Sequence, residues 1–128
     1  MTIERTFSAA PWESQVGYCR ALKVGDRILV TGTAAVADDG TPYAPGDAYA
    51  QAKRCIELIG RALGELGADL TQVVRTRLFV TDIDRWAEYG RAHKEAFADN
   101  PPVTTMVQVA RLIDPAMLVE IEAEAVVG

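Results

Sequence analysis

The clearest structural signal in this chain is a helix followed by a strand, encoded by DAYAQAKRCIELIGRALGELG at residues 47–67 and VVRTRLFV at residues 73–80. Asp47 is suited to cap the start of the helix, and Gly67 suits the left-handed conformation that ends one. The second stretch is rich in β-branched and aromatic residues, which is typical of a strand. The apolar residues of the first recur every three or four positions and predict one buried helix face: Ala52, Cys55, Ile56, Ile59, Ala62, Leu63 and Leu66.

Shorter segments on both sides complete the order of elements. Gly25 and Asp26 supply the turn of a hairpin. Five segments have the composition of strands, at residues 3–7, 18–23, 27–33, 104–109 and 118–127. A second helix is predicted to start at the capping residue Asp84, with an inner face of Trp86, Tyr89, Gly90, His93 and Phe97. This order predicts an α+β fold of one domain, residues 1–128, with a mixed β-sheet and two helices packed on one face.

The sheet of such a fold has a second face that the helices do not cover. Ile, Val and Thr occur on both sides of most predicted strands. Because exposed apolar strands are unfavourable in water, oligomerisation is the simplest way to cover this face. We therefore expect the chain to associate with copies of itself.

Composition excludes several classes of function. The net charge of −5, without any run of basic residues, argues against a nucleic acid partner. Neither a signal peptide nor an apolar stretch of membrane-spanning length is visible, so we expect a cytoplasmic protein with no membrane partner. One histidine and two scattered cysteines give no credible metal site, and no motif for a cofactor is present.

Three carboxylates near the C-terminus are candidates for chemistry. In the predicted strand 118–127, Glu120, Glu122 and Glu124 alternate with apolar residues and therefore share one face. A solvated strand face is the simpler interpretation. If a neighbouring subunit covers that face, however, one carboxylate becomes partly buried and can activate a water molecule.

Other polar residues admit a structural and a functional interpretation. We expect Tyr18 and Arg20 to share a face of an early strand, where Tyr18 packs with a satisfied hydroxyl or lines a site. Gly32 either lets a ligand approach the backbone or forms a plain bulge. His93 is more simply a satisfied core or interface histidine than a ligand-binding group.

The C-terminal sequence carries a family resemblance. PVTTMVQVARL at residues 102–112, followed by LVEIEA at residues 118–123, resembles the signature of the RidA family, also called YjgF or endoribonuclease L-PSP-like. That signature reads proline, a small residue, arginine, a small residue, cysteine, Val-Glu-Val-Ala-Arg-Leu and, further on, a hydrophobic residue with Glu-Ile-Glu. Further matches run through nearly the whole chain: Gly17-Tyr18, Val24-Gly25, Thr31-Gly32, Phe79-Val80 and Asp82.

The resemblance implies a fold, an assembly and an activity. The fold is chorismate-mutase-like, and the assembly is a homotrimer with a small-molecule cleft at each subunit interface. Family deaminases hydrolyse enamines and imines such as 2-iminobutanoate, using an arginine that binds the substrate carboxylate and a glutamate that positions water. Glu120 and Tyr18 match the glutamate and a tyrosine of these sites, and Thr31-Gly32 matches a Ser-Gly segment.

Three positions depart from the family pattern. Thr104 stands in place of the arginine, Met106 in place of the cysteine, and Gly90 in place of an asparagine. Threonine offers one neutral hydroxyl where arginine offers a charged fork, so the resemblance points to an arginine-lacking branch with a different ligand. Arg20 or Arg77 could hold an anionic ligand instead, although a solvated or ion-paired role is the simpler alternative.

Two functions therefore remain open from the sequence. The first is a hydrolase of small C=N compounds with altered specificity, using Glu120 and Tyr18 and a pocket that includes Thr31, Gly32, Thr104, Met106, Arg20 and His93. The second is a metabolite-binding or regulatory protein without catalysis. RNA cleavage, which the family's endoribonuclease name suggests, is the least favoured because the chain is acidic.

Overall fold

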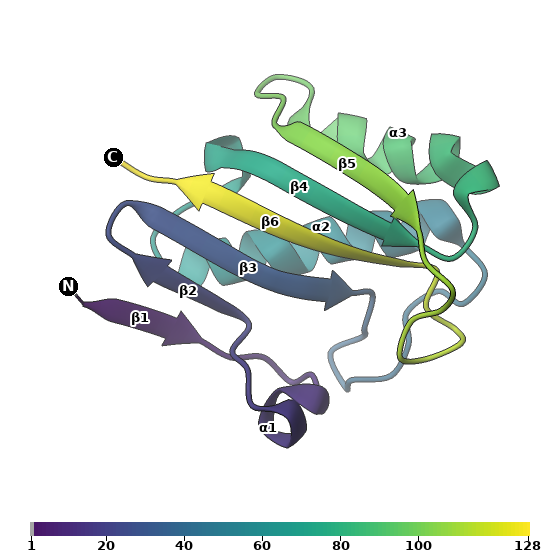
Figure 1. Ribbon diagram of the computed structural model, residues 1–128, viewed down its shortest axis with the longest axis horizontal. Helices are drawn as coiled ribbons and strands as arrows, with labels where there is room; N and C mark the ends of the chain where they lie inside the picture. The colour runs from purple at the N-terminus through teal and green to yellow at the C-terminus, as the bar shows by residue number, and fades with distance from the viewer. Residues whose placement is uncertain (1) are drawn as a thin grey trace.

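The computed structural model describes residues 2–128 and contains a six-stranded sheet with the strand order β1-β2-β3-β6-β4-β5 (Figure 1). Its strands are β1 (Ile3–Thr6), β2 (Ala21–Val24), β3 (Arg27–Ala34), β4 (Val73–Val80), β5 (Val103–Gln108) and β6 (Val119–Val126). Strands β4 and β5 run parallel, and the other neighbours are antiparallel. The mixed sheet of an α+β fold is therefore confirmed.

Two long helices pack on the same face of this sheet, as predicted (Figure 1). Helix α2 (Ala48–Glu65) lies against β3 and β6, and α3 (Trp86–Phe97) packs beside α2. Asp47 caps α2 by accepting a hydrogen bond from the backbone nitrogen of Ala50 at 2.9 Å. Gly67 follows the helix with a φ of 82°, which confirms its role as the left-handed residue.

The N-terminal part of the fold differs from the prediction. A short helix, α1 (Trp12–Val16), was not predicted, because its five residues carry no repeating apolar pattern. Gly17 ends it with a φ of 91°. Strand β2 then begins only at Ala21, so the expectation that Tyr18 and Arg20 lie within a strand is wrong: both precede it.

The start of α3 also differs from the prediction. Asp82, not Asp84, is the capping residue, and it accepts from the backbone nitrogen of Asp84 at the start of a 3-10 turn, η2 (Ile83–Arg85). Trp86 is the first residue of α3 and 63% of its surface is exposed, so its predicted place on the buried face is wrong. Tyr89 and Phe97 are buried, as expected for the inner face. A second 3-10 turn, η1 (Leu70–Gln72), precedes β4.

Strand β6 lies inside the sheet, between β3 and β4, and its side chains alternate between the two faces. Its residues Val119, Ile121, Ala123 and Ala125 are buried beneath the helices. The three glutamates that alternate with them therefore lie on the opposite, open face, as predicted. No helix among residues 2–128 is both long and apolar enough to cross a membrane.

Candidate functional site

Several of the predicted site residues meet around one hollow of about 290 Å³. It opens where the N-terminal segment, the C-terminal end of β3, the start of β6 and the side of α2 come together. Tyr18, Arg20, Gly32 and Glu120 line it. We call this space the Glu120 hollow. The fold thus brings together four predicted residues that lie up to about a hundred positions apart in the chain.

Gly32 provides the space in which the Glu120 carboxylate lies. A β carbon added at Gly32 would stand 2.6 Å from Oε2 of Glu120, closer than any real contact allows. The pairing of β3 with β6 shifts register between Val30 and Thr33, so Gly32 also lies in a β-bulge. The bulge considered for Gly32 in the sequence analysis is therefore present. The missing side chain of this glycine lets the Glu120 carboxylate approach the backbone.

Electrostatics prepare Glu120 for proton transfer. Burial raises the pKa of its carboxyl group, the positive charge of Arg20 lowers it, and neighbouring Glu122 raises it further. A carboxylate whose pKa lies above its ordinary value is a stronger base at neutral pH. Glu120 is therefore placed to accept a proton from a water molecule in the hollow.

Arg20 lies behind this carboxylate in a buried ion pair that the sequence did not reveal. Its Nη2 is 3.0 Å and its Nε 3.2 Å from Oε2 of Glu13, and both side chains are more than nine-tenths buried. The guanidinium carbon also lies 5.8 Å from the centre of the Tyr18 ring. Arg20 thus contacts Tyr18 and the wall of the hollow while its charge is compensated by Glu13.

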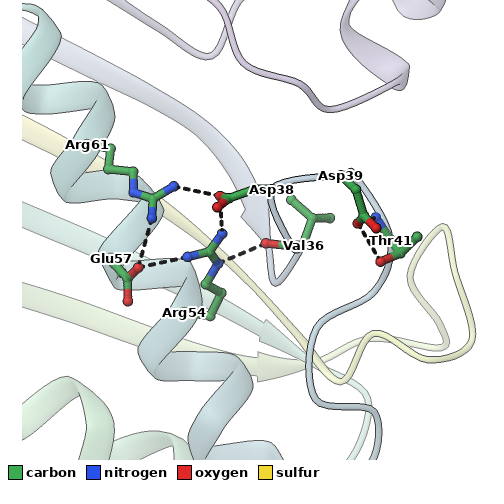
Figure 2. A network of polar contacts seen from close by, with 7 residues as sticks. All are labelled: Val36, Asp38, Asp39, Thr41, Arg54, Glu57 and Arg61. Carbon is green, nitrogen blue, oxygen red and sulfur yellow. Dashed lines mark hydrogen bonds and ion pairs between the residues drawn. The ribbon is translucent and has the colours of Figure 1, made fainter.

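A second polar network joins α2 to the loop before it (Figure 2), and Arg54, Arg61 and Asp38 of this network line the hollow. Arg54 of α2 is buried; its Nε donates to the carbonyl of Val36 at 2.8 Å, and its other nitrogens contact Asp38 and Glu57. The half-exposed Arg61 contacts the same two carboxylates. The two cations of this network are therefore compensated by its two anions.

The remaining predicted residues on β5 and α3 lie at the far edge of the sheet. Thr76 of β4 is buried; its hydroxyl donates to Oγ1 of Thr104 at 2.7 Å and lies 2.8 Å from Nε2 of His93. The hydroxyl of Thr76 thus joins His93 and Thr104 in one chain of polar contacts. Burial lowers the pKa of His93, which favours the neutral ring. The partly buried Met106 packs against the core nearby.

Thr31 and Arg77 lie on the open face of the sheet, beside a wider hollow of about 770 Å³. Nη1 of Arg77 is 3.3 Å from Oε1 of Glu122, in an exposed ion pair that corresponds to the simpler interpretation of this arginine. Cys19 lines the same hollow, whereas Cys55 is fully buried. Within residues 2–128, no three His, Cys, Asp or Glu side chains lie close enough together to hold a metal ion.

Sequence reasoning missed Glu13, Thr33, Arg54 and Thr76. For Thr76 a signal existed, because it lies two residues before Leu78 and four before Val80 and therefore shares their buried face of the strand. For Glu13 none did, because it lies in a short helix without periodicity. The partners of Arg54 lie in a turn-rich loop whose path is set by tertiary packing.

Comparisons with known proteins agree over nearly the whole chain. The family model described as endoribonuclease L-PSP matches residues 7–127. An uncharacterized protein of Streptomyces coelicolor is 39% identical over 126 residues, which cover 98% of this chain and 93% of that protein. The 2-iminobutanoate/2-iminopropanoate deaminase of Rattus norvegicus is 30% identical over 127 residues, or 98% of this chain and 92% of the deaminase.

A solved structure gives the same fold. The crystal structure of a Mycobacterium tuberculosis member of the YjgF/YER057c/UK114 family matches with a TM-score of 0.89 and 44% identity. The match covers 98% of this chain and 100% of that one. The arrangement of strands and helices that forms the Glu120 hollow is therefore shared with a relative of substantial sequence identity.

Proposed function

Because this chain belongs to the endoribonuclease L-PSP family, also known as YjgF or RidA, we propose that it binds a small metabolite in clefts between the subunits of a homotrimer. In these clefts it hydrolyses a C=N bond, with Glu120 positioning the water and Tyr18 contacting the ligand. The observation that carries this proposal is the Glu120 carboxylate, half-buried in a hollow beside Tyr18 with a raised pKa.

The hydrolysis that this geometry supports takes two proton transfers. Glu120 accepts a proton from water as the water oxygen bonds to the carbon of the C=N group, and it returns this proton to nitrogen, which gives a carbinolamine. The carboxylate then moves the hydroxyl proton of the carbinolamine to nitrogen as the C–N bond breaks and the C=O bond forms, so the products are a carbonyl compound and ammonia or an amine. Relatives from rat and human that are named 2-iminobutanoate/2-iminopropanoate deaminase support this reaction type.

A site between subunits is supported by the position of β5. One group of site residues lies at the β5 edge of the sheet: Thr104, Met106 and His93. Strand β4 separates this group from the hollow beside β6 and β3 that contains Glu120 and Tyr18. Neither of the two hollows described above is lined by residues of both groups. A neighbouring subunit that presents its β5 edge to the Glu120 hollow would complete one cleft from both groups.

Altered specificity is supported by the polar contacts of Thr104. Its hydroxyl is part of a neutral chain with Thr76 and His93, and no cation takes part in that chain. Losing a charged contact to a ligand carboxylate costs about 2–4 kcal/mol, roughly 30-fold to 1000-fold in binding. We therefore expect ligands without a carboxylate at this position to be preferred over 2-imino acids.

The test compares two substrate classes in one hydrolysis assay. 2-Imino acids are generated from serine or threonine by a dehydratase, and imines without a carboxylate are supplied directly. We expect slow hydrolysis of the acids, faster hydrolysis of an uncharged imine, and loss of both in Glu120→Gln. Thr104→Arg should raise activity on the acids. Hydrolysis of 2-imino acids as fast as that of an arginine-bearing relative would contradict the altered specificity.

Metabolite binding without catalysis is the second candidate. One observation favours it: the arginines around the hollow are paired with Glu13, Asp38 and Glu57. None of these arginines is therefore free to bind an acidic substrate. Binding of a small ligand with equal affinity in the wild type and in Glu120→Gln, without turnover in either, would favour this candidate.

A further inference from the structure

We propose that Arg20, held by Glu13, is a positioning residue: it fixes the bulge of β3 on which the Glu120 carboxylate rests. The inference rests on the proposed role of Glu120, but it concerns the groups that place this carboxylate. It differs from the anion-binding role considered for Arg20 in the sequence analysis.

Arg20 contacts each of the three residues that form the bulge. The backbone nitrogen of Thr31 donates to the carbonyl oxygen of Arg20 at 3.0 Å. Nη1 of Arg20 donates to the carbonyl of Gly32 at 3.1 Å and to Oγ1 of Thr33 at 3.2 Å. Because a bulge interrupts the regular ladder, such contacts from outside the strand define its geometry.

The bulge in turn determines where Glu120 can lie. A β carbon at Gly32 would stand 2.6 Å from Oε2 of Glu120, so the carboxylate can keep its present place only against the bare backbone of a glycine. A change in the path of β3 at Gly32 would therefore move or expose the carboxylate. The contacts of Arg20 with the bulge thus act on Glu120 through the strand and not through a ligand.

Glu13 holds the guanidinium in this orientation. Oε2 of Glu13 accepts from Nε and Nη2 of Arg20, and Oε1 accepts from the backbone nitrogen of Ser8 at 2.9 Å. The Ser8 hydroxyl donates to Glu13 as well. Nε, Nη1 and Nη2 of the buried guanidinium thus all have partners within the chain. Removing either charge would leave the other buried and uncompensated.

Arg20 also acts on Glu120 directly through its charge, which lowers the pKa of the carboxyl group against the effect of burial. Glu122 on the same strand acts in the opposite direction. The other titratable groups that face the hollow or the carboxylate come from the N-terminal segment, from α2 and from the loop before it: Tyr18, Asp38, Arg54, Cys55, Arg61 and Glu65.

Changing either partner of the buried pair therefore gives a test of positioning. The test is an NMR titration of ¹³C-labelled carboxyl groups in the full chain, with the Glu120 signal assigned by its loss in Glu120→Gln. Arg20→Lys keeps the positive charge but loses the forked contacts to Gly32 and Thr33, so the carboxylate should enter solvent and its pKa should fall towards the ordinary value. In Glu13→Gln the guanidinium loses the group that orients it, and the pKa of Glu120 should fall as well.

Both variants are compared with Arg61→Gln, which removes an arginine of the same hollow that is 51% exposed and paired elsewhere. The Glu120 midpoint should stay close to that of the wild type in this control. If Arg20→Lys does not fold, Gly32→Ala displaces the same carboxylate from the other side, and the pKa of Glu120 should again fall towards its ordinary value as the group enters solvent.

An unchanged Glu120 midpoint in folded Arg20→Lys would overturn the inference, since a lysine that keeps only the charge would then serve as well as the arginine. The titration needs no turnover. A chain without hydrolytic activity but with a lowered midpoint in Arg20→Lys would therefore refute the proposed catalysis and leave the positioning role supported.

Discussion

The burial of the Glu120 carboxyl group costs the folded state stability at neutral pH. Because burial raises the pKa of this carboxyl group, the folded state binds its proton more tightly than the unfolded state does. Above the folded-state pKa the group is ionised in both states, and the folded state carries the cost of a desolvated charge. The stability contributed by the protonated form is thus lost as the pH rises through the folded-state pKa.

We expect Glu120→Gln to raise the melting temperature at pH 7–8, and this gain to disappear at a pH below the ordinary value of a glutamate. Thermal unfolding across this pH range measures the effect. The matched control is Glu122→Gln, on the same strand and face but 40% exposed and paired with Arg77; it should bring no such gain. A lower melting temperature for Glu120→Gln at pH 7–8 would show that the attraction between the carboxylate and the charge of Arg20 outweighs desolvation.

At this scale, sequence reasoning found the groups that project from regular strands and missed those fixed by tertiary contacts. Alternation placed Glu120 on the open face, and the resemblance pointed to Tyr18 and Gly32. The partnership of Glu13 with Arg20 was not predictable, because it depends on a short helix and a loop that fold against β3. The side chains that set the electrostatics of the hollow therefore became visible only in the structure.

At the scale of elements, helix α2 contains a glycine that the fold does not need. Gly64 is exposed inside the helix, and a β carbon added there would meet nothing within 4 Å. We expect Gly64→Ala to stabilise the protein by about 0.5–1 kcal/mol, because alanine loses less backbone entropy in a helix. Urea unfolding provides the measurement.

The control for this substitution lies three residues further on. Gly67 has a φ of 82° in equally open space, so Gly67→Ala introduces backbone strain without a steric clash. It should destabilise the protein by about 1 kcal/mol. Equal effects of the two alanines would contradict the explanation, since only the backbone conformation differs between the sites.

The accuracy of the predicted elements followed their length. Helix α2 and strands β4 and β6 have enough periodic positions for the pattern to fix them. Helix α1, the late start of β2 and the turn η2 are short, and their limits depend on local hydrogen bonds such as the one between Asp82 and Asp84. Patterns of hydrophobicity carry no information about such bonds.

At the scale of the whole molecule, the order of strands in the sheet could not be predicted from the sequence. The C-terminal strand β6 inserts between β3 and β4, and β5 joins β4 in parallel after the crossover through α3. These pairings join residues up to about a hundred positions apart, and periodicity says nothing about partners at such distances. The prediction that both helices pack on one face was confirmed, because it depends only on which side chains of each strand are buried and not on the order of the strands.

The open face that this topology leaves is the basis of the last prediction. Leu29, Val103 and Val107 lie on it with 39%, 61% and 42% of their surfaces exposed. Burying such side chains against a second copy is favourable, and the proposed clefts need the β5 edge of a neighbour. We therefore expect light scattering to give a mass of three times 13.9 kDa at micromolar concentration.

A charge placed on this face should disrupt the assembly if the face is an interface. We expect Val107→Asp to shift the mass towards a single chain of 13.9 kDa, because an aspartate buried there would lack a partner. Lys94→Glu, on the exposed side of α3, is the control and should leave the assembly intact. A wild-type chain that stays monomeric would contradict the trimer. A trimer that tolerates Val107→Asp would place the contacts elsewhere, and the proposed pairing of the β5 edge with the Glu120 hollow would then fail.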